Sequence, residues 1–162
     1  MNWIGLWTLT SREVGRFFKV YRQTVIPGLI SSVLYILIFG FTLEQRISSI
    51  EGISYTIFII PGLIMMNTLT NASSNPSSSL LQMKLTGQVP DLMQAPLSSL
   101  EISLAFIVGG VVRGVVNGIL ILLIGMWIGG MEVLYPIATI GFIFIVSVAF
   151  SSMGLLLGQL AD

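Results

Sequence analysis

Three asparagines, Asn67, Asn71 and Asn75, recur every four residues within an otherwise apolar stretch of the chain. This spacing places their side chains on one face of a helix. An amide in hydrocarbon is costly unless it is hydrogen-bonded, so this face should turn toward protein or water rather than lipid. Two interpretations follow: the asparagines line a translocation path, or they join helices by hydrogen bonds.

A second polar pair, Arg113 and Asn117, stands four residues apart in the middle of another apolar run. A charge at this depth costs roughly 2.5–3.5 kcal/mol on insertion scales, so Arg113 needs a partner, and no acid is expected at the same depth. The candidate partners are the asparagine face, a second copy of the protein, a further part of the polypeptide, or an anionic substrate. We assign Arg113 and Asn117, with the three asparagines, to the candidate translocation path. Structural hydrogen bonding is an equally good explanation of Arg113.

The chain lacks the residues that most enzymes need. It has no cysteine and no histidine, which removes thiol catalysis and the commonest metal ligand and general base. Its acids are expected in loops, at span ends or at the terminus, without paired spacing for acid–base or metal chemistry: Glu13, Glu44, Glu51, Asp91, Glu101, Glu132 and Asp162. No phosphate-binding G-x-x-x-x-G-K-[ST] motif occurs. We predict no catalytic residue, no metal and no cofactor in this chain, so if ATP drives this protein, another chain binds it.

Composition indicates a membrane protein. Of the 162 residues, 54% are hydrophobic and only 9% charged, whereas soluble domains carry about 25% charged residues. The net charge of zero gives no support for nucleic-acid binding. We predict an all-α membrane protein with a single transmembrane domain over residues 1–162. Its four predicted spans each have enough residues to cross a hydrocarbon core of about 30 Å: 25–43, 53–82, 102–128 and 135–160.

The segment 2–23 before the first span is predicted to be an interfacial amphipathic helix. An aromatic and apolar face with Phe17 and Phe18 lies beside a basic face, which suits a helix on the membrane surface. The alternative is an ordinary cytoplasmic lead-in. Four basic residues lie in this segment and the single Lys84 precedes the loop 85–97, whereas the turn 44–52 has only Arg46 beside two acids. Both termini and the loop 85–97 are therefore predicted to be cytoplasmic, with the turns 44–52 and 129–135 outside.

Glycines and prolines mark two further features of the spans. Pro61 and Gly62 interrupt the second span and are a candidate hinge. Gly110, Gly114 and Gly118 recur every four residues in the third span. Such a stripe of small residues lets another helix approach closely, so helix packing is the preferred role.

The loop 85–97 is unusually rich in helix breakers for so short a segment. Gly87 and Pro90 are expected to interrupt the helix of the second span. Pro90 could be the first residue of a new short helix, and the negative charge of Asp91 suits the first turn of that helix. Pro96 would end this helix, and Val89, Leu92 and Met93 would form an exposed apolar face. The segment is either a knob that docks a soluble partner or a solvated turn that links two spans.

Three blocks, "GISYTIFIIPGLIMMNTLTNASSN", "DLMQAPLSSLEI" and "GGVVRGVVNGILI", occur in this order along the chain. In order and spacing they resemble the membrane subunit of a type-2 ATP-binding cassette exporter, a bacterial permease of the polysaccharide, Nod-factor and drug exporter group. The resemblance covers essentially all 162 residues. It implies a multi-pass protein of the bacterial or archaeal cytoplasmic (inner) membrane.

The resemblance also implies a partner and a mechanism. Such permeases have six spans, contact membrane lipids, and work as homodimers or with a related permease, each half bound to a cytoplasmic ATP-binding cassette ATPase. The segment 2–23 would be the connecting helix, and the asparagine face of the second span would line the path. The coupling helix that fits the ATPase would comprise Gly87, Gln88, Val89, Pro90, Asp91, Leu92, Met93, Ala95 and Pro96.

The expected function is outward transport of a lipid-linked glycan, a drug or a similar amphipathic substrate, driven by a separate ATPase. Since four spans are found where the family has six, the chain is expected to be an incomplete permease domain, either a fragment or a truncated product. The alternative is a membrane scaffold or assembly protein that transports nothing. A secondary transporter driven by ions usually has Asp or Glu residues within the membrane, and the predicted spans have none. An intramembrane enzyme has the least support, because the chain lacks histidine, cysteine and paired acids.

Overall fold

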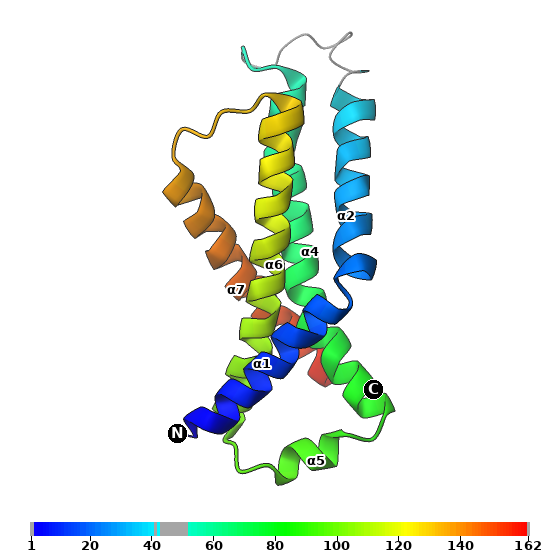
Figure 1. Cartoon of the computed structure of the whole chain (residues 1–162), viewed down its shortest axis with the longest axis vertical. Helices are drawn as coiled ribbons and strands as arrows, with labels where there is room; N and C mark the ends of the chain where they lie inside the picture. Colours follow the sequence, from blue (N-terminus) through cyan, green and yellow to red (C-terminus); the bar gives the residue numbers. More distant parts are fainter. Residues whose placement is uncertain (1, 41, 43–51, 162) are drawn as a thin grey trace.

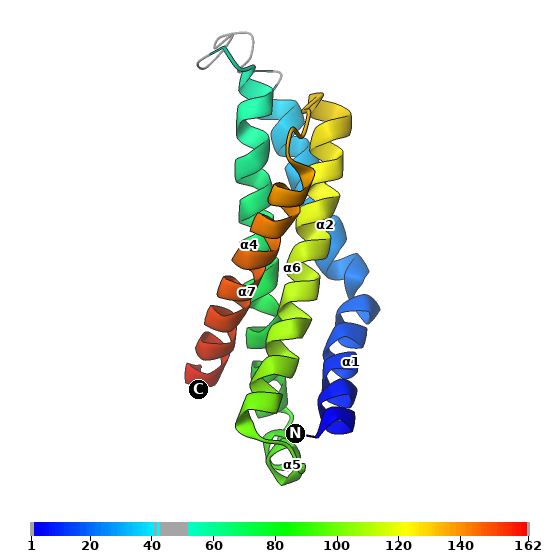
Figure 2. The ribbon, with the colours of Figure 1, turned by 90° about the vertical axis from the view of Figure 1, so that its left-hand side faces the viewer.

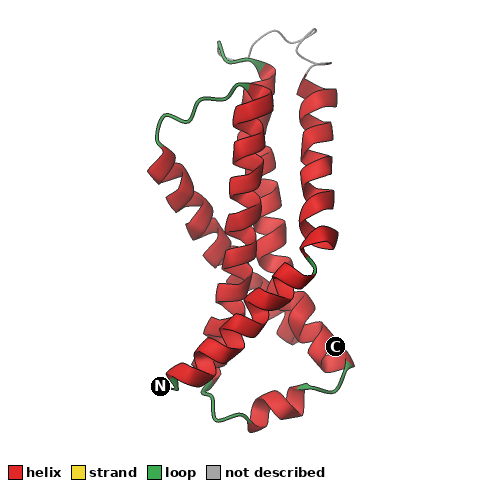
Figure 3. Cartoon of the chain, viewed as in Figure 1, coloured by secondary structure: helices red, strands yellow, loops and turns green. Residues whose placement is uncertain are grey.

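A computed structural model describes residues 2–40, 42 and 52–161 (Figure 1). Within these residues the fold consists of helices and connecting loops (Figure 3). The helices are α1 (Trp3–Lys19), α2 (Tyr21–Tyr35), the π-helix η1 (Ile36–Gly40), α4 (Tyr55–Leu85), α5 (Val89–Gln94), α6 (Ser99–Gly129) and α7 (Pro136–Leu160). Four of them are long and apolar enough to cross a membrane: α2 with η1, α4, α6 and α7. The predicted all-α membrane fold with four spans is confirmed.

The helices form one elongated bundle. α4 and α6 stand side by side through its centre, and α7 packs against both (Figures 1 and 2). α1 crosses α6 obliquely, while α2 and η1 flank α4 and α6. Both termini and α5 lie toward one end of the bundle, and the loop 130–135 lies at the other. This arrangement agrees with the predicted grouping of loops, and which end faces the cytoplasm stays a prediction.

The boundary between α1 and α2 lies earlier in the sequence than the predicted boundary between the segments 2–23 and 25–43. α1 ends at Lys19 because the Val20 N–H is shared between the carbonyl oxygens of Arg16 and Phe17, and Val20 leaves helical geometry with ψ near 14°. α2 then begins at Tyr21, so the first span starts before residue 25. The end of that span, most of the turn 44–52, and Glu44, Glu51 and Asp162 lie outside the described residues.

The central helix α4 has 31 residues, which corresponds to a length of about 46 Å at 1.5 Å per residue. It therefore exceeds a hydrocarbon core of about 30 Å and carries the chain beyond the membrane. The predicted interruption at Pro61 and Gly62 is wrong, because α4 continues through these residues and through Pro76. Neighbouring helices and polar side chains can satisfy the backbone groups that a proline frees within a span. The proposed hinge role of Pro61 and Gly62 stays a prediction.

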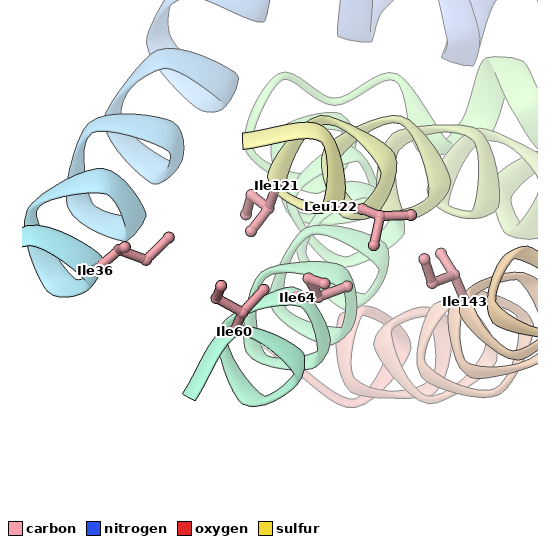
Figure 4. Close-up of a cluster of buried hydrophobic side chains, with 6 residues drawn as sticks. All are labelled: Ile36, Ile60, Ile64, Ile121, Leu122 and Ile143. Carbon is pink, nitrogen blue, oxygen red and sulfur yellow. The ribbon is translucent and has the colours of Figure 1, made fainter. Parts of the chain in front are cut away.

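The bundle core has two apolar layers. One layer joins η1, α4, α6 and α7 (Figure 4) and contains Ile36, Ile60, Ile64, Ile121, Leu122 and Ile143. The other lies toward α5 and contains Leu9, Met83, Ala105, Phe106 and Leu155. Along α4, α6 and α7, the residues between these layers include buried polar side chains. The polar groups singled out in the sequence thus lie in the middle of the bundle.

The glycine stripe of α6 lies at the contacts with α4 and α7. A Cβ added at Gly110 would come within 2.7 Å of the Ala72 carbonyl oxygen, and one at Gly114 within 2.8 Å of the Ala72 Cβ. At Gly118 an added Cβ would lie 2.5 Å from Thr68 Oγ1. Only a residue without a side chain allows the backbones to approach so closely.

Candidate functional site

Each asparagine of α4 is hydrogen-bonded to a different helix. Asn67 donates from Nδ2 to Ser32 Oγ of α2 at 2.9 Å. Asn71 Oδ1 accepts from Arg113 Nε of α6 at 3.1 Å. The carbonyl oxygen of Asn75 accepts from Arg16 Nη2 of α1 at 2.9 Å. The asparagine face is therefore buried among helices of the same chain, which matches the helix-joining interpretation.

Of the partners considered for Arg113, the structure provides the asparagine face. Arg113 is buried, and its carbonyl oxygen accepts a hydrogen bond of 2.8 Å from Asn117 Nδ2. Asn71, Arg113 and Asn117 thus form one connected group between α4 and α6. Their assignment to a translocation path stays a prediction, because the Arg113–Asn71 bond joins α6 to α4 and the Asn117–Arg113 bond lies within α6.

Replacing Asn71 with leucine is expected to destabilise the folded protein by about 1–3 kcal/mol, because Arg113 Nε then loses its acceptor inside the bundle. Adding Arg113→Met should recover part of this loss, since the unpaired charge is removed. Unfolding of the single and double variants in detergent micelles gives the coupling free energy. If the losses of unfolding free energy in the two single variants simply add in the double variant, Asn71 and Arg113 do not stabilise each other.

A separate crevice of about 540 Å³ opens between the first span and α4. Its α4 wall includes Gly62 and Met66, which are exposed and lie on a different face from the asparagines. Its aromatic lining residues are Tyr35, Phe39, Tyr55 and Phe58. This crevice was not predicted, because the sequence does not show which faces of α2 and α4 remain open.

The turn that leads from α4 into α5 has a defined backbone geometry. Gly87 has φ near 69°, in the left-handed region that glycine adopts readily. Gln88 N–H donates to the Met83 carbonyl at 2.9 Å, and Gly87 N–H to that of Lys84 at 3.2 Å. These two bonds make a Schellman motif, which satisfies the last carbonyls of α4 and fixes the direction of the following chain.

The helix α5 begins at Val89, so Pro90 is its second residue rather than its first, and Asp91 lies in its first turn. The predicted exposed apolar face is only partly correct. Val89 and Leu92 turn inward and pack against the apolar layer around Met83, whereas Met93 remains 79% exposed. Gln88 and Asp91 are also exposed. The outer surface of α5 therefore offers Met93 as an apolar side chain beside the polar side chains of Gln88, Asp91 and Gln94, and Pro90 is exposed with them.

The end of the bundle that carries α5 is held together by polar contacts. Asn2 donates from its backbone to Glu101 and from Nδ2 to the Pro96 carbonyl at 3.3 Å. Glu101 also forms a capping box with Ser98 at the start of α6. A cleft of about 410 Å³ lies between α1 and α5, with Arg12, Gln88 and Asp91 among its lining residues.

The sequence interpretation missed a buried pair on α1. Glu13, expected like the other acids in a loop, at a span end or at the terminus, lies inside α1 and is fully buried, and its Oε2 lies 3.4 Å from Arg16 Nη2. A signal for this burial was present: Leu9, Glu13 and Phe17 share one helical face, so the acid stands in the middle of an apolar stripe. Among the described residues no group of acids is arranged to hold a metal ion.

Comparisons with known proteins agree with this architecture. The profile of the ABC-2 type transporter family matches residues 5–162. The inner membrane transport permeases YadH of Escherichia coli K12 and of Shigella flexneri are each 35% identical over 161 residues. The matched region covers 99% of this chain and 63% of each relative. No solved structure matches.

The family and the multi-pass inner-membrane architecture predicted from the sequence are therefore confirmed, by the profile and by the four membrane-length helices. This chain is a member of the ABC-2 type transporter family.

Proposed function

We propose that this chain is the membrane-spanning permease part of an ATP-binding cassette exporter. A separate ATPase subunit binds ATP with Mg²⁺, and the permease moves a lipid-linked glycan, a drug or a similar amphipathic substrate outward. Two copies, or this chain and a related permease, act together in the lipid bilayer. Membership of the ABC-2 type transporter family supports the proposal, and the observation that carries the site is the exposed helix α5.

α5 has the properties of a docking element. It stands at the end of the 31-residue helix α4, beyond the length that a bilayer needs. The Schellman turn at Gly87 and the Asn2–Pro96 bond hold its two ends in place. Met93 is exposed as an apolar anchor, with Gln88 and Asp91 as a polar rim, which is the composition of small protein interfaces.

The inner surface of α5 connects this docking element to the bundle. Val89 and Leu92 pack against a layer that contains residues of α1, α4, α6 and α7. When ATP closes the partner ATPases, movement of α5 is passed through this layer to the spans. Packed interiors transmit such displacements because they have few voids. The asparagine face and the aromatic crevice are the two candidate linings of the path.

Co-purification tests the proposed function. The tagged chain, co-expressed with the ATPase subunit encoded beside it, should retain that subunit through detergent extraction. Replacing Met93 with aspartate should lower retention at least tenfold, whereas Leu134→Asp in the loop at the opposite end should have no effect. Both positions are highly exposed, so neither substitution disturbs the core.

A chain that is stably inserted but never retains the ATPase would favour the scaffold interpretation. A chain that retains the ATPase equally in all variants would exclude α5 as the docking element. Transport in vesicles driven by an ion gradient without ATP would instead indicate a secondary transporter.

A further inference from the structure

A charged residue lies inside the apolar face of α1. Leu9, Glu13 and Phe17 stand four residues apart and are all buried, and Glu13 is 0% exposed. Gly109 of α6 makes room for the base of this side chain, since a Cβ added at Gly109 would lie 2.9 Å from the Glu13 Cβ. The missing side chain at Gly109 therefore allows an acid to enter the contact between α1 and α6.

A single nitrogen of Arg16 contacts three oxygen atoms of two helices. Nη2 lies 3.4 Å from Glu13 Oε2, donates to the Asn75 carbonyl oxygen at 2.9 Å, and lies 3.4 Å from Asn75 Oδ1. Asn75 directly precedes Pro76, whose ring and missing N–H weaken α4 at this turn. Arg16 thus holds α1 to α4 beside a weak point of that helix.

Three buried polar atoms of these same residues have no hydrogen-bond partner among the described residues: Glu13 Oε1, Arg16 Nε and Asn75 Nδ2. The first is an acceptor and the other two are donors. Glu13 and Asn75 meet at Gly109, because an added Cβ there would also lie 3.1 Å from Asn75 Nδ2. A water molecule can donate to the one acceptor and accept from both donors, and buried waters typically make about three such bonds.

We propose that Glu13, Arg16 and Asn75 form a buried binding site for one water molecule. The water completes the ion pair, and the site fixes α1 to α4 and α6; we call this site the α1 junction. A buried ion pair persists only when its remaining polar groups are also hydrogen-bonded, and the water supplies those bonds. α1 is then an integral part of the bundle and not a helix that merely rests on the membrane surface.

The junction also has a consequence for transport, and this part rests on the proposed function. Asn2 ties the start of α1 to the loop after α5, and Arg16 ties its other half to Asn75. Movement of α5 therefore reaches α4 beside Pro76 through α1, as well as through the apolar layer. Glu13 and Arg16 are positioning residues in this account, since they act through Asn75.

The water site is tested by a structure of the protein in lipid nanodiscs at a resolution that shows ordered waters. We expect one density peak within hydrogen-bonding distance of Glu13 Oε1, Arg16 Nε and Asn75 Nδ2. Well-ordered side chains with no such peak would overturn the site.

The anchoring of α1 is tested by thiol labelling, because the chain has no cysteine of its own. Leu9→Cys places a reporter on the buried face of α1.

Two variants test the contacts of Glu13 in this background. Arg16→Met removes the partner of Glu13, and Gly109→Ala adds a methyl group between Glu13 and Asn75 while keeping every polar group. Both should raise the rate of maleimide labelling at least tenfold. The matched controls Lys19→Met and Gly15→Ala should leave it unchanged, since Lys19 is exposed and Gly15 has open space around it. Equal labelling in all backgrounds would refute the anchoring.

A transport measurement separates this proposal from the function on which its last step rests. Arg16→Met should lower the substrate exported per ATP hydrolysed at least tenfold, while ATPase retention stays as in the unchanged protein. If the Arg16→Met variant retains the ATPase and exports as much substrate per ATP hydrolysed as the unchanged protein, the positioning role of Arg16 is refuted. If the unchanged protein fails to retain the ATPase, the proposed function fails, and the water density and labelling rates still decide the α1 junction.

Discussion

Replacing Gly154 with alanine is expected to destabilise the folded bundle by about 1–3 kcal/mol or more. Gly154 lies where α7 meets α4, and an added Cβ would lie 2.6 Å from the carbonyl carbon and from the Cα of Ser73, and closer still to its carbonyl oxygen. These are backbone atoms of a packed helix, so the strain cannot be relieved by turning a side chain. α7 must move away from α4, and the buried contacts between them are lost.

The matched control is Gly141→Ala in the same helix. Apart from the neighbouring backbone of α7 itself, no heavy atom lies within 4 Å of a Cβ added there, and alanine is favoured over glycine in a helix by about 1 kcal/mol. Gly141→Ala should therefore leave the free energy of unfolding unchanged or raise it slightly. Thermal unfolding of both variants in the same detergent measures the difference, and equal stability of the two would contradict the close contact of α4 with α7.

Charge reversal on the outer surface of α5 is expected to have the largest effect on transport. Asp91→Lys should reduce ATP-dependent export at least tenfold, with normal insertion into the membrane. Asp91 is exposed in the first turn of α5 and contributes to no core layer. If Asp91 faces a positively charged patch of the partner, a lysine at this position places two positive charges together. Such like-charge contacts can cost several kcal/mol at an interface.

Two controls sharpen this result. Glu132→Lys reverses an exposed charge in the loop at the opposite end of the bundle and should leave export unchanged. Asp91→Asn removes the charge without reversing it and should have a smaller effect than Asp91→Lys. Export and ATPase association that both survive Asp91→Lys would show that this face of α5 does not dock the ATPase.

The membrane architecture was predictable because it depends on local properties of the sequence. Long apolar runs specify the spans, and the predicted second span, 53–82, already contains more residues than a bilayer requires, as α4 does. Gly87 signalled the turn before α5, since a left-handed residue is needed to end α4 there. The family was also predictable, because three blocks of the sequence carry its resemblance along the whole chain.

The partners of the polar residues were harder to predict, because they depend on which helices become neighbours. The sequence showed that Arg113 needs a partner, but only the packing of α6 on α4 identifies Asn71. The burial of Glu13 likewise depends on the approach of Gly109 from a helix distant in the sequence. Val89 and Leu92 turn inward because an apolar layer lies behind α5, which the pattern of a six-residue helix does not reveal.

Site-specific crosslinking tests the central claim, that α5 docks an ATP-binding cassette ATPase, most directly. The absence of native cysteines allows a single thiol at Gln88 or Met93, both exposed on α5, and a control thiol at Leu134. The account predicts crosslinks from positions 88 and 93 to the co-expressed ATPase, with a yield that changes when ATP is added, and almost none from position 134. Stable protein that forms no crosslink at either α5 position would contradict it.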